Sequence, residues 1–90
     1  MSDLTVDDFA VGEDYSVGAA EGLVLHLDLV QPLPQAVREG GGFRLEFVGP
    51  TAPVLPQAIY ALSRDGEQRD IFLVPVARDA RGVRYEAIFN

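Results

Sequence analysis

The chain has 90 residues, a formal net charge of −7 and no cysteine. A chain of this length makes one small domain, 1–90, whose core is modest enough that association with another chain would help it. The absence of cysteine excludes disulfides and thiolate metal sites, and no apolar run approaches the 18 or more residues of a transmembrane helix. The first ten residues contain three Asp and no basic residue, so we expect no signal peptide.

The acidic excess lies in the first part of the chain. Residues 1–37 contain seven Asp or Glu and no Arg, whereas residues 38–90 contain seven acidic residues and seven Arg. Nucleic acids and anionic membranes select positively charged surfaces, so we expect neither as a partner. The asymmetry is explained either by a solvated acidic face or by steering of the acidic part of one copy toward the Arg-bearing part of another.

The opening segment LTVDDF, residues 4–9, predicts a short helix. Thr5 can cap it, Asp8 can return the hydrogen bond three residues later, and Leu4 and Phe9 occupy the positions of a hydrophobic staple. Gly12 ends the helix within two turns, so we expect it to plug one end of a sheet. The acidic residues lack the spacing of a calcium-binding loop.

Alternating apolar residues predict three strands in the first half of the chain. The strand at 14–19 has Tyr15 and Val17 on one face. The strand at 23–30 has four leucines on one face and is stopped by Pro32 and Pro34. The third strand, which follows the three glycines, points three apolar side chains inward and two charged side chains outward. The inward residues are Leu23, Leu25, Leu27 and Leu29 in the second strand, and Phe43, Leu45 and Phe47 in the third.

Two segments without a strand pattern join these elements. Residues 34–42, PQAVREGGG, predict a mobile loop, because the helix start and Lys of a phosphate-binding loop do not follow the glycines. Residues 49–56, GPTAPVLP, predict a stiff connector to the next strand. Their proline spacing of three is also compatible with a polyproline II ligand for an aromatic groove.

The second half of the chain predicts three more strands. Residues 57–64 place Ala58, Tyr60 and Leu62 on one face, and Asp65-Gly66 predicts a two-residue hairpin turn into the strand at 68–78. The uninterrupted apolar run Ile71–Val76 indicates either a strand covered on both faces or one whose second face meets a partner. Pro75 within this strand predicts a bulge or a free edge. After a turn at 79–82, residues 83–89 alternate, with Val83, Tyr85, Ala87 and Phe89 on one side.

Together these elements predict an all-β fold, a small antiparallel barrel or two-layer sandwich of about six strands with a short N-terminal helix. We expect no enzyme, no catalytic residue, no cofactor and no metal. His26 is the sole histidine and there is no Lys, so imidazole metal sites and Schiff-base chemistry are excluded. A Ser–His–Asp set could use only His26, which alternates with core leucines and is expected to lie at the surface or in an interface.

Several segments of the sequence resemble a family of bacterial domains of about 90 residues and unknown function. They are LTVDDFAVGEDYSV, PLPQAVREGGGFRLEFVGP and above all the strand FLVP and the ending RYEAIFN, residues 72–75 and 84–90. The resemblance covers nearly the whole chain. It implies encoding beside proteins of the phage-tail-collar, microcystin-dependent type, and hence a part in a tail-like or fibre structure, either in the cytoplasm or on an exported particle. It implies no catalytic residues.

The sequence therefore predicts a non-enzymatic module for protein–protein interaction or self-assembly, with a phage-tail-collar-type protein as a possible partner. The motivating observation is that more strand positions are apolar than one inner face requires. We expect the contact patch to consist of Ile59, Ile71, Leu73 and Ile88, with Arg84 and Glu86 setting the register at its rim. The alternative is a small-ligand-binding barrel whose mouth lies near the glycine loop and the proline connector and is lined by the hydroxyl of Tyr60 or Tyr85.

Overall fold

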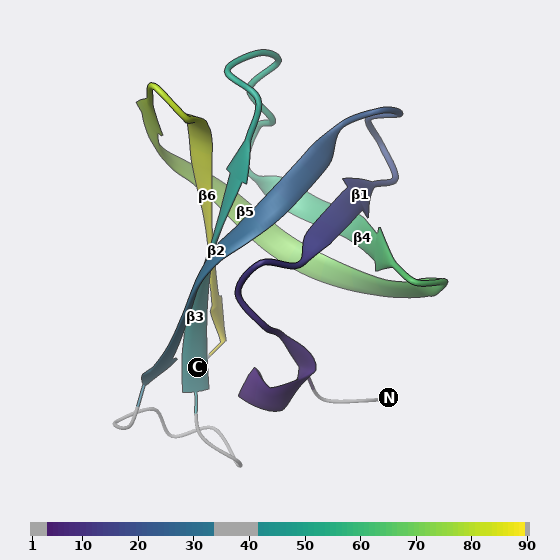
Figure 1. The fold of residues 1–90 in the computed structure, drawn as a ribbon, viewed down its shortest axis with the longest axis vertical. Helices are drawn as coiled ribbons and strands as arrows, with labels where there is room; N and C mark the ends of the chain where they lie inside the picture. The colour runs from purple at the N-terminus through teal and green to yellow at the C-terminus, as the bar shows by residue number, and fades with distance from the viewer. Residues whose placement is uncertain (1–3, 34–41, 90) are drawn as a thin grey trace.

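The computed structural model describes residues 4–33 and 42–89, which form a closed antiparallel barrel (Figure 1). The order of strands around the barrel is β1-β2-β3-β6-β5-β4, and pairing of β1 with β4 closes it. This confirms the all-β prediction and, of the two architectures expected, selects the barrel. The strands are β1 (Asp14–Val17), β2 (Val24–Leu33), β3 (Gly42–Gly49), β4 (Ala58–Arg64), β5 (Glu67–Asp79) and β6 (Gly82–Phe89).

The barrel interior is filled by alternate residues of the strands. Successive side chains of a strand point to opposite faces, so every second residue enters the core. The inward faces expected for β1, β3, β4 and β6 are confirmed, and β2 follows its expected alternation up to Leu27. The largest fully buried side chains are Tyr15, Tyr85, Phe43, Phe47, Leu25, Leu27, Leu45, Leu62, Ile71, Leu73 and Val83.

Strand β2 departs from its expected pattern after Leu27. The register against β3 shifts between Leu27 and Leu29, which is the signature of a β-bulge. Leu29 is therefore half-buried instead of lying in the core with the other leucines, and Val30 packs against the core from the face expected to be outer. The strand also continues through Pro32 to Leu33. Proline is tolerated there because this half of β2 pairs only with β3, which leaves its other edge without a ladder.

Strand β5 is shared between two ladders. Its first half pairs with β4 as far as Leu73, and its second half pairs with β6 from Val74 onward. At Pro75 one edge is free of pairing, and the register against β6 shifts between Pro75 and Ala77. A bulge and a free edge were the two alternatives predicted from the position of Pro75, and the structure has both. Strand β5 thus pairs with β4 along its first half and with β6 along its second half, and this offset allows the small sheet to close into a barrel.

The hairpin between β4 and β5 has the two-residue turn that was predicted. Asp65 and Gly66 both have positive φ, with values of 53° and 81°, as a type I′ turn requires. The turn sets Tyr60 opposite Ile71 and Ile59 opposite Phe72. It therefore decides which residues of β5 enter the barrel.

The N-terminal segment closes one end of the barrel. Its helix is a single 3-10 turn, η1 (Val6–Asp8), in which the Thr5 N–H donates to Asp8 Oδ2 at 2.7 Å. The turn delivers Phe9 into a set of rings. The centroid of Phe9 lies 5.7 Å from that of Phe43 and 6.2 Å from that of Phe89. The expected plug is thus one aromatic side chain carried by a short turn.

Two further expectations concern the glycine-rich loop and membrane-spanning helices. Of the glycine-rich loop predicted at 34–42, only Gly42 lies within the described residues, where it begins β3. No helix in the described parts of the chain has the length and apolar character to cross a membrane.

Candidate functional site

The outer face of β4 and β5 carries exposed apolar side chains. Ile59 and Phe72 are cross-strand partners, and 68% of Ile59 and 50% of Phe72 are accessible to solvent. Val76, at the bulge of β5, is 49% exposed. We call Ile59, Phe72 and Val76 the outer apolar strip. Aromatic and β-branched side chains paired across strands bring their apolar surfaces together, so Ile59 and Phe72 present one continuous area.

The structure corrects the expected contact patch at two positions. Ile71 and Leu73 point into the barrel, with 1% and 0% exposure, so they are core residues and not part of an outer surface. The residue between them, Phe72, takes the outer position. Ile88 is on the outer face as expected, with 52% exposure, and lies on β6 opposite Arg44 of β3.

Arg84 and Glu86 lie in an ion-pair network on the outer face of β2, β3 and β6. Arg84 donates to Glu46 at 2.9 Å and to Asp28 at 2.7 Å, and Arg81 donates to the same Asp28 carboxylate at 2.9 Å. Charges on three adjacent strands are therefore joined through shared carboxylates, with Arg84 at the centre.

The network continues through Arg44 on β3. Its guanidinium pairs with Glu46 on the same strand, donates to Glu86 at 2.6 Å and donates to the Gln31 side chain at 2.9 Å. Arg84 and Glu86 are thus engaged within their own chain. We find no pairing that extends from them to the outer apolar strip in the described residues.

Asp28 is the residue of the network whose titration is most perturbed. Hydrogen bonds from Arg81 and Arg84 lower its pKa from 3.8 to about 2. Donors that are themselves cations stabilise the ionised carboxylate. Asp28 therefore remains charged in all but strongly acidic solution.

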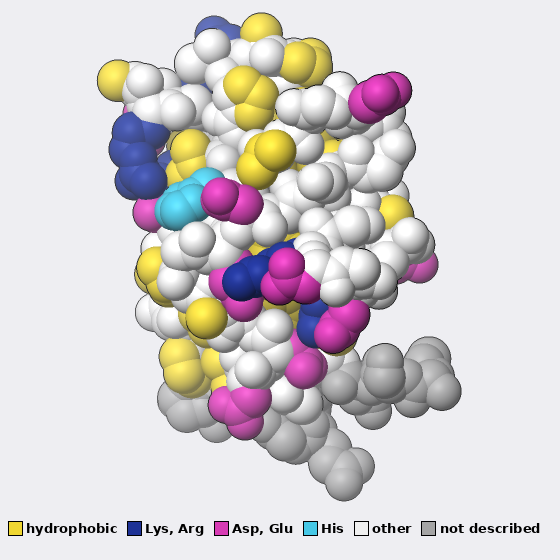
Figure 2. Space-filling view, turned by 45° about the vertical axis from the view of Figure 1, so that its right-hand side comes forward, with side chains coloured by type: hydrophobic (Ala, Val, Ile, Leu, Met, Phe, Trp, Pro, Cys, Tyr) yellow, Lys and Arg dark blue, Asp and Glu magenta, His cyan; other side chains and the backbone are white. Residues whose placement is uncertain are grey.

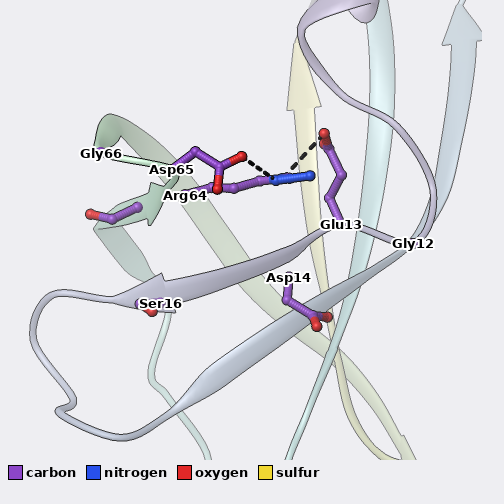
Figure 3. Close-up of a pocket in the computed structure, with 8 residues that line it drawn as sticks. Gly12, Glu13, Asp14, Ser16, Arg64, Asp65 and Gly66 are labelled. Atoms are coloured by element: carbon purple, nitrogen blue, oxygen red, sulfur yellow. Dashed lines mark hydrogen bonds and ion pairs between the residues drawn. The ribbon is translucent and has the colours of Figure 1, made fainter.

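A second group of charges lies beside a depression between the start of β1 and the β4–β5 turn. Arg64 reaches from the end of β4 toward Glu13, with Nε 3.2 Å from Glu13 Oε2, and its Nη1 donates to Asp65 at 2.9 Å (Figure 3). The Nε approach lacks the alignment of a hydrogen bond. An open depression of about 510 Å³ adjoins these groups and is lined by Gly12, Glu13, Asp14, Ser16, Ser63, Arg64, Asp65 and Gly66. Its single cation is held between two carboxylates, which leaves the depression acidic.

Glu13 links this charged group to the core. The Tyr15 hydroxyl donates to Glu13 at 2.8 Å, and so does the Ala10 N–H at 2.9 Å. Burial raises the pKa of Glu13, but these hydrogen bonds and the nearby arginines outweigh it and hold the pKa below its ordinary value. Burial, and then the bond to Glu13, raise the pKa of Tyr15 far above its ordinary value.

His26 lies at the surface on β2, in agreement with its expected position. Its Nδ1 is 2.7 Å from Asp14 Oδ1, across the β1–β2 ladder, and both side chains are exposed by 45% or more. The structure shows no hydrogen bond from His26 to a serine within the described ranges. Residues 4–33 and 42–89 contain no group of three or more His, Asp or Glu side chains placed to hold a metal ion.

The tyrosine hydroxyls expected to line a ligand site instead hold the proline connector. The Leu55 N–H donates to the Tyr85 hydroxyl at 2.8 Å, and the Tyr60 hydroxyl donates to the Pro56 carbonyl. Leu55 itself is buried. These contacts fix residues 55–56 to the barrel and occupy both hydroxyls.

The distribution of charge over the surface follows from these pairings. On the face shown in Figure 2, basic and acidic side chains lie against each other, with apolar side chains scattered around them. Five arginines of the described residues have carboxylate partners: Arg44, Arg64, Arg69, Arg81 and Arg84. The sixth, Arg78, is exposed and has no ion pair among the described residues. Most cationic charge is therefore neutralised within the chain.

Sequence reasoning missed Phe72 and Val76, although the signal for both was present. A two-residue turn at 65–66 places inward-facing Tyr60 opposite residue 71, which assigns Phe72 outward. Val76 follows Phe72 by four residues, so the same alternation assigns it outward as well. The apolar run Ile71–Val76 has no alternation of its own, so the pattern alone does not show which of its residues face outward.

Comparison with known proteins gives one match. A family model described as a domain of unknown function (DUF6916) matches residues 4–89. No curated protein and no solved structure matches the chain.

Proposed function

We propose that this chain, which belongs to the DUF6916 family of domains of unknown function, is a non-enzymatic module for protein–protein interaction. Its contact surface is the outer face of β4 and β5. The observation that carries the proposal is the cross-strand pair Ile59 and Phe72, both at least half exposed on a paired, regular part of the sheet. A regular sheet gains nothing by leaving an aromatic and a β-branched side chain in water, and contact with another protein would bury both.

The arrangement of charge supports this choice of surface. The outer face of β2, β3 and β6 is covered by the ion-pair network, whose members already have partners. Burying such groups against another protein would cost desolvation without new pairing. The face of β4 and β5 carries no comparable network in the part of the chain that the structure describes, so its desolvation is less costly.

The proposal extends to the setting of the contact. The family resemblance in the FLVP strand and the RYEAIFN ending implies a bacterial protein that assists a phage-tail-like or fibre structure. Subunits of such structures associate through repeated surface contacts, for which a small rigid barrel with one apolar face is suited. The module would act in the cytoplasm or be carried on an exported particle.

The second candidate function is small-ligand binding. The observation in its favour is the open depression beside Glu13 and Arg64. The engagement of Arg64 by two carboxylates weighs against an anionic ligand. Screening small molecules by amide chemical shifts tests it: shifts centred on Ser16, Ser63 and Gly66 would support ligand binding, and their absence would remove it.

Site-specific photo-crosslinking in the native host tests the main proposal. A photoreactive phenylalanine derivative replaces Phe72 in one variant and the similarly exposed Val24 of β2 in the control. We expect a discrete protein adduct from position 72 that disappears when Ile59 is also changed to Asp, and none from position 24. Absence of any adduct from position 72 overturns the proposal.

A further inference from the structure

Before its bulge, the outer face of β5 runs from an acid to apolar side chains. Asp70 pairs with Ala61 of β4, and alternation places it on the same face as Phe72 and Val74. Asp70 and Phe72 are exposed, and Val74 is half-buried. The first half of this face therefore presents one carboxylate followed by two apolar side chains.

After the bulge, the same face ends in a second acid. Ala77 pairs with Arg84, a member of the outer ion-pair network, and Asp79 follows Ala77 by two residues. Alternation turns Ala77 and Asp79 outward, and both are exposed. Arg78, between them, has the phase of buried Val83 and so belongs to the opposite face of the strand. The β5 outer row is Asp70, Phe72, Val74, Ala77 and Asp79.

Neither terminal carboxylate of the row has an ion pair in the described residues. Asp79 accepts a hydrogen bond from the backbone N–H of Arg81 at 2.8 Å, while the Arg81 guanidinium is paired with Asp28. Arg84, the base that borders the row on β6, is likewise held by carboxylates of the network. The charges that this face leaves for a partner, at Asp70 and at Asp79, are therefore both negative.

The two acids disfavour both a second copy of the chain and an anionic membrane as the partner. Two copies packed face to face with their β5 strands along each other would set acid against acid at both ends, whichever way the strands run. Like charges brought together in an interface cost several kcal/mol. An anionic membrane surface repels the same carboxylates. The partner that fits this face must carry bases.

We propose that the partner is a segment of a different protein in which an apolar stripe is flanked at each end by Lys or Arg. The stripe covers Val74 and the outer apolar strip, in which Ile59 extends the contact from Phe72 onto β4. The bases pair with Asp70 and Asp79 in charge-assisted hydrogen bonds. The inference rests on the proposed function and names the chemistry of the partner of the same face.

An amphipathic helix fits the length of the row. The strand from Asp70 to Asp79 spans roughly 30 Å at the rise of a β-strand, and a helix of about 20 residues has the same length. Helices pack on sheets through one apolar stripe with i, i+3 and i+4 spacing. We therefore expect the segment to be a helix of about five turns with a base near each end.

Two synthetic helical peptides of about 20 residues test the sign of the partner's charge. Both carry the same leucine stripe, and one has Arg at each end where the other has Glu. We expect calorimetric titration at low ionic strength to show at least about tenfold tighter binding of the Arg-ended peptide, because two attractive contacts replace two repulsive ones. The preference should shrink at about 0.5 M salt. Amide chemical shift changes should centre on Ala61, Phe72 and Ala77.

Paired neutralisations separate the effect of the two acids from that of the net charge. Asp70→Asn combined with Asp79→Asn keeps a side-chain oxygen for the Arg81 N–H and should remove the preference for Arg ends. Asp7→Asn combined with Glu21→Gln removes the same charge at two exposed positions outside β5, and this control should keep the preference. Thermal melting shows that each variant is folded.

The outcomes separate this inference from the function on which it rests. Equal affinities for the two peptides overturn the basic partner, as does binding of neither peptide up to millimolar concentration. A preference that survives Asp70→Asn with Asp79→Asn overturns it as well. In each of these cases a protein adduct from position 72 in the photo-crosslinking experiment would still support the proposed function. A preference lost in that variant and kept in the control supports the basic partner.

Discussion

Gly82 packs directly against Gly49: a Cβ atom at position 82 would lie 1.9 Å from the Gly49 carbonyl oxygen. Gly82 also has φ +141°, a conformation that residues with a side chain rarely adopt. The first strand residue of β6 therefore has to be glycine for two independent reasons. We expect Gly82→Ala to lower the free energy of unfolding by more than about 2 kcal/mol, measured by urea denaturation.

Gly22→Ala is the matched control for this substitution. Gly22 has φ +82°, but no heavy atom outside Gly22 and its two chain neighbours lies within 4 Å of the position its Cβ would take. Gly22→Ala therefore measures the backbone strain alone, and we expect it to lower the free energy of unfolding by about 1 kcal/mol. Equal losses for the two variants would contradict the close approach of Gly82 to Gly49.

The two faces of β5 should respond differently to truncation. Leu73→Ala removes a side chain that is fully buried, and we expect it to cost about 3 kcal/mol in unfolding free energy. Phe72→Ser removes a larger side chain from the outer face and should change stability by less than about 1 kcal/mol. Urea denaturation at low protein concentration measures both without a contribution from association. A larger loss for Phe72→Ser would place Phe72, and not Leu73, in the core.

The sequence was sufficient for the elements and most of their faces. Regular alternation in 43–47 and 83–89 determines which side chains enter the core, because a strand has a period of two and those segments contain no bulge. The Ile71–Val76 run contains no alternation, so it carries no information about phase. Only the turn at Asp65-Gly66, which fixes its register against β4, could supply that phase.

The candidate site was less predictable because it depends on which strands are neighbours. The network around Arg84 joins β2, β3 and β6, and two of its carboxylates, Asp28 and Glu46, are 56 and 38 residues away in sequence. Alternation can place Asp28, Glu46 and Arg84 on the outer faces of their strands, but it does not show that the three side chains are in contact. The bulge after Leu27 was likewise not predictable from the local pattern, whereas Pro75 indicated the bulge on β5.

Asp28 should make the fold sensitive to acid. Its pKa is about 2 in the folded chain, below its ordinary value of 3.8. Its stabilising effect is therefore fully present above the ordinary value and is lost as the pH falls toward 2. We expect Asp28→Asn to be less stable than the wild type at pH 7 and to converge with it as the pH approaches 2. Urea denaturation across this range, with NMR titration of the carboxyl group, measures the effect. Asp70→Asn, which removes a carboxylate without an ion pair in the described residues, should show no such convergence.

Tyr15 should control stability in alkali. Its folded pKa lies far above the ordinary value of 10. The protonated hydroxyl therefore stabilises the fold up to about pH 10, and that stability is lost at higher pH as the unfolded chain ionises. Tyr15→Phe removes the hydrogen bond to Glu13 and should cost about 1 kcal/mol at pH 7. The difference from wild type should shrink above pH 10, as followed by denaturation and by tyrosine absorbance. A constant difference would contradict the raised pKa.

Phe9 should be the residue by which the N-terminal segment stabilises the barrel. It is buried against Phe43 and Phe89, and the Arg69 guanidinium lies 5.7 Å from its ring centroid. We expect Phe9→Ala to lower the unfolding free energy by about 3 kcal/mol in urea denaturation. Hydrogen exchange should also show faster opening of β6 in this variant.

Val11→Ala is the control for the same segment. The Val11 side chain is 61% exposed. Its truncation should change the unfolding free energy by only about 0.5 kcal/mol or less. Unchanged exchange of β6 in Phe9→Ala, as in this control, would mean that the segment does not close the barrel.

The position of β6 has a consequence for synthesis on the ribosome. Because β6 lies between β3 and β5, these two strands lack their common neighbour until residues 82–89 have emerged from the exit tunnel. The nascent chain can form the local hairpins β1–β2 and β4–β5 early, but it stays an open sheet with exposed edges, a state prone to aggregation. Closure therefore waits for β6 to emerge, and a chaperone that shields β3 and β5 during translation would raise the yield of folded protein.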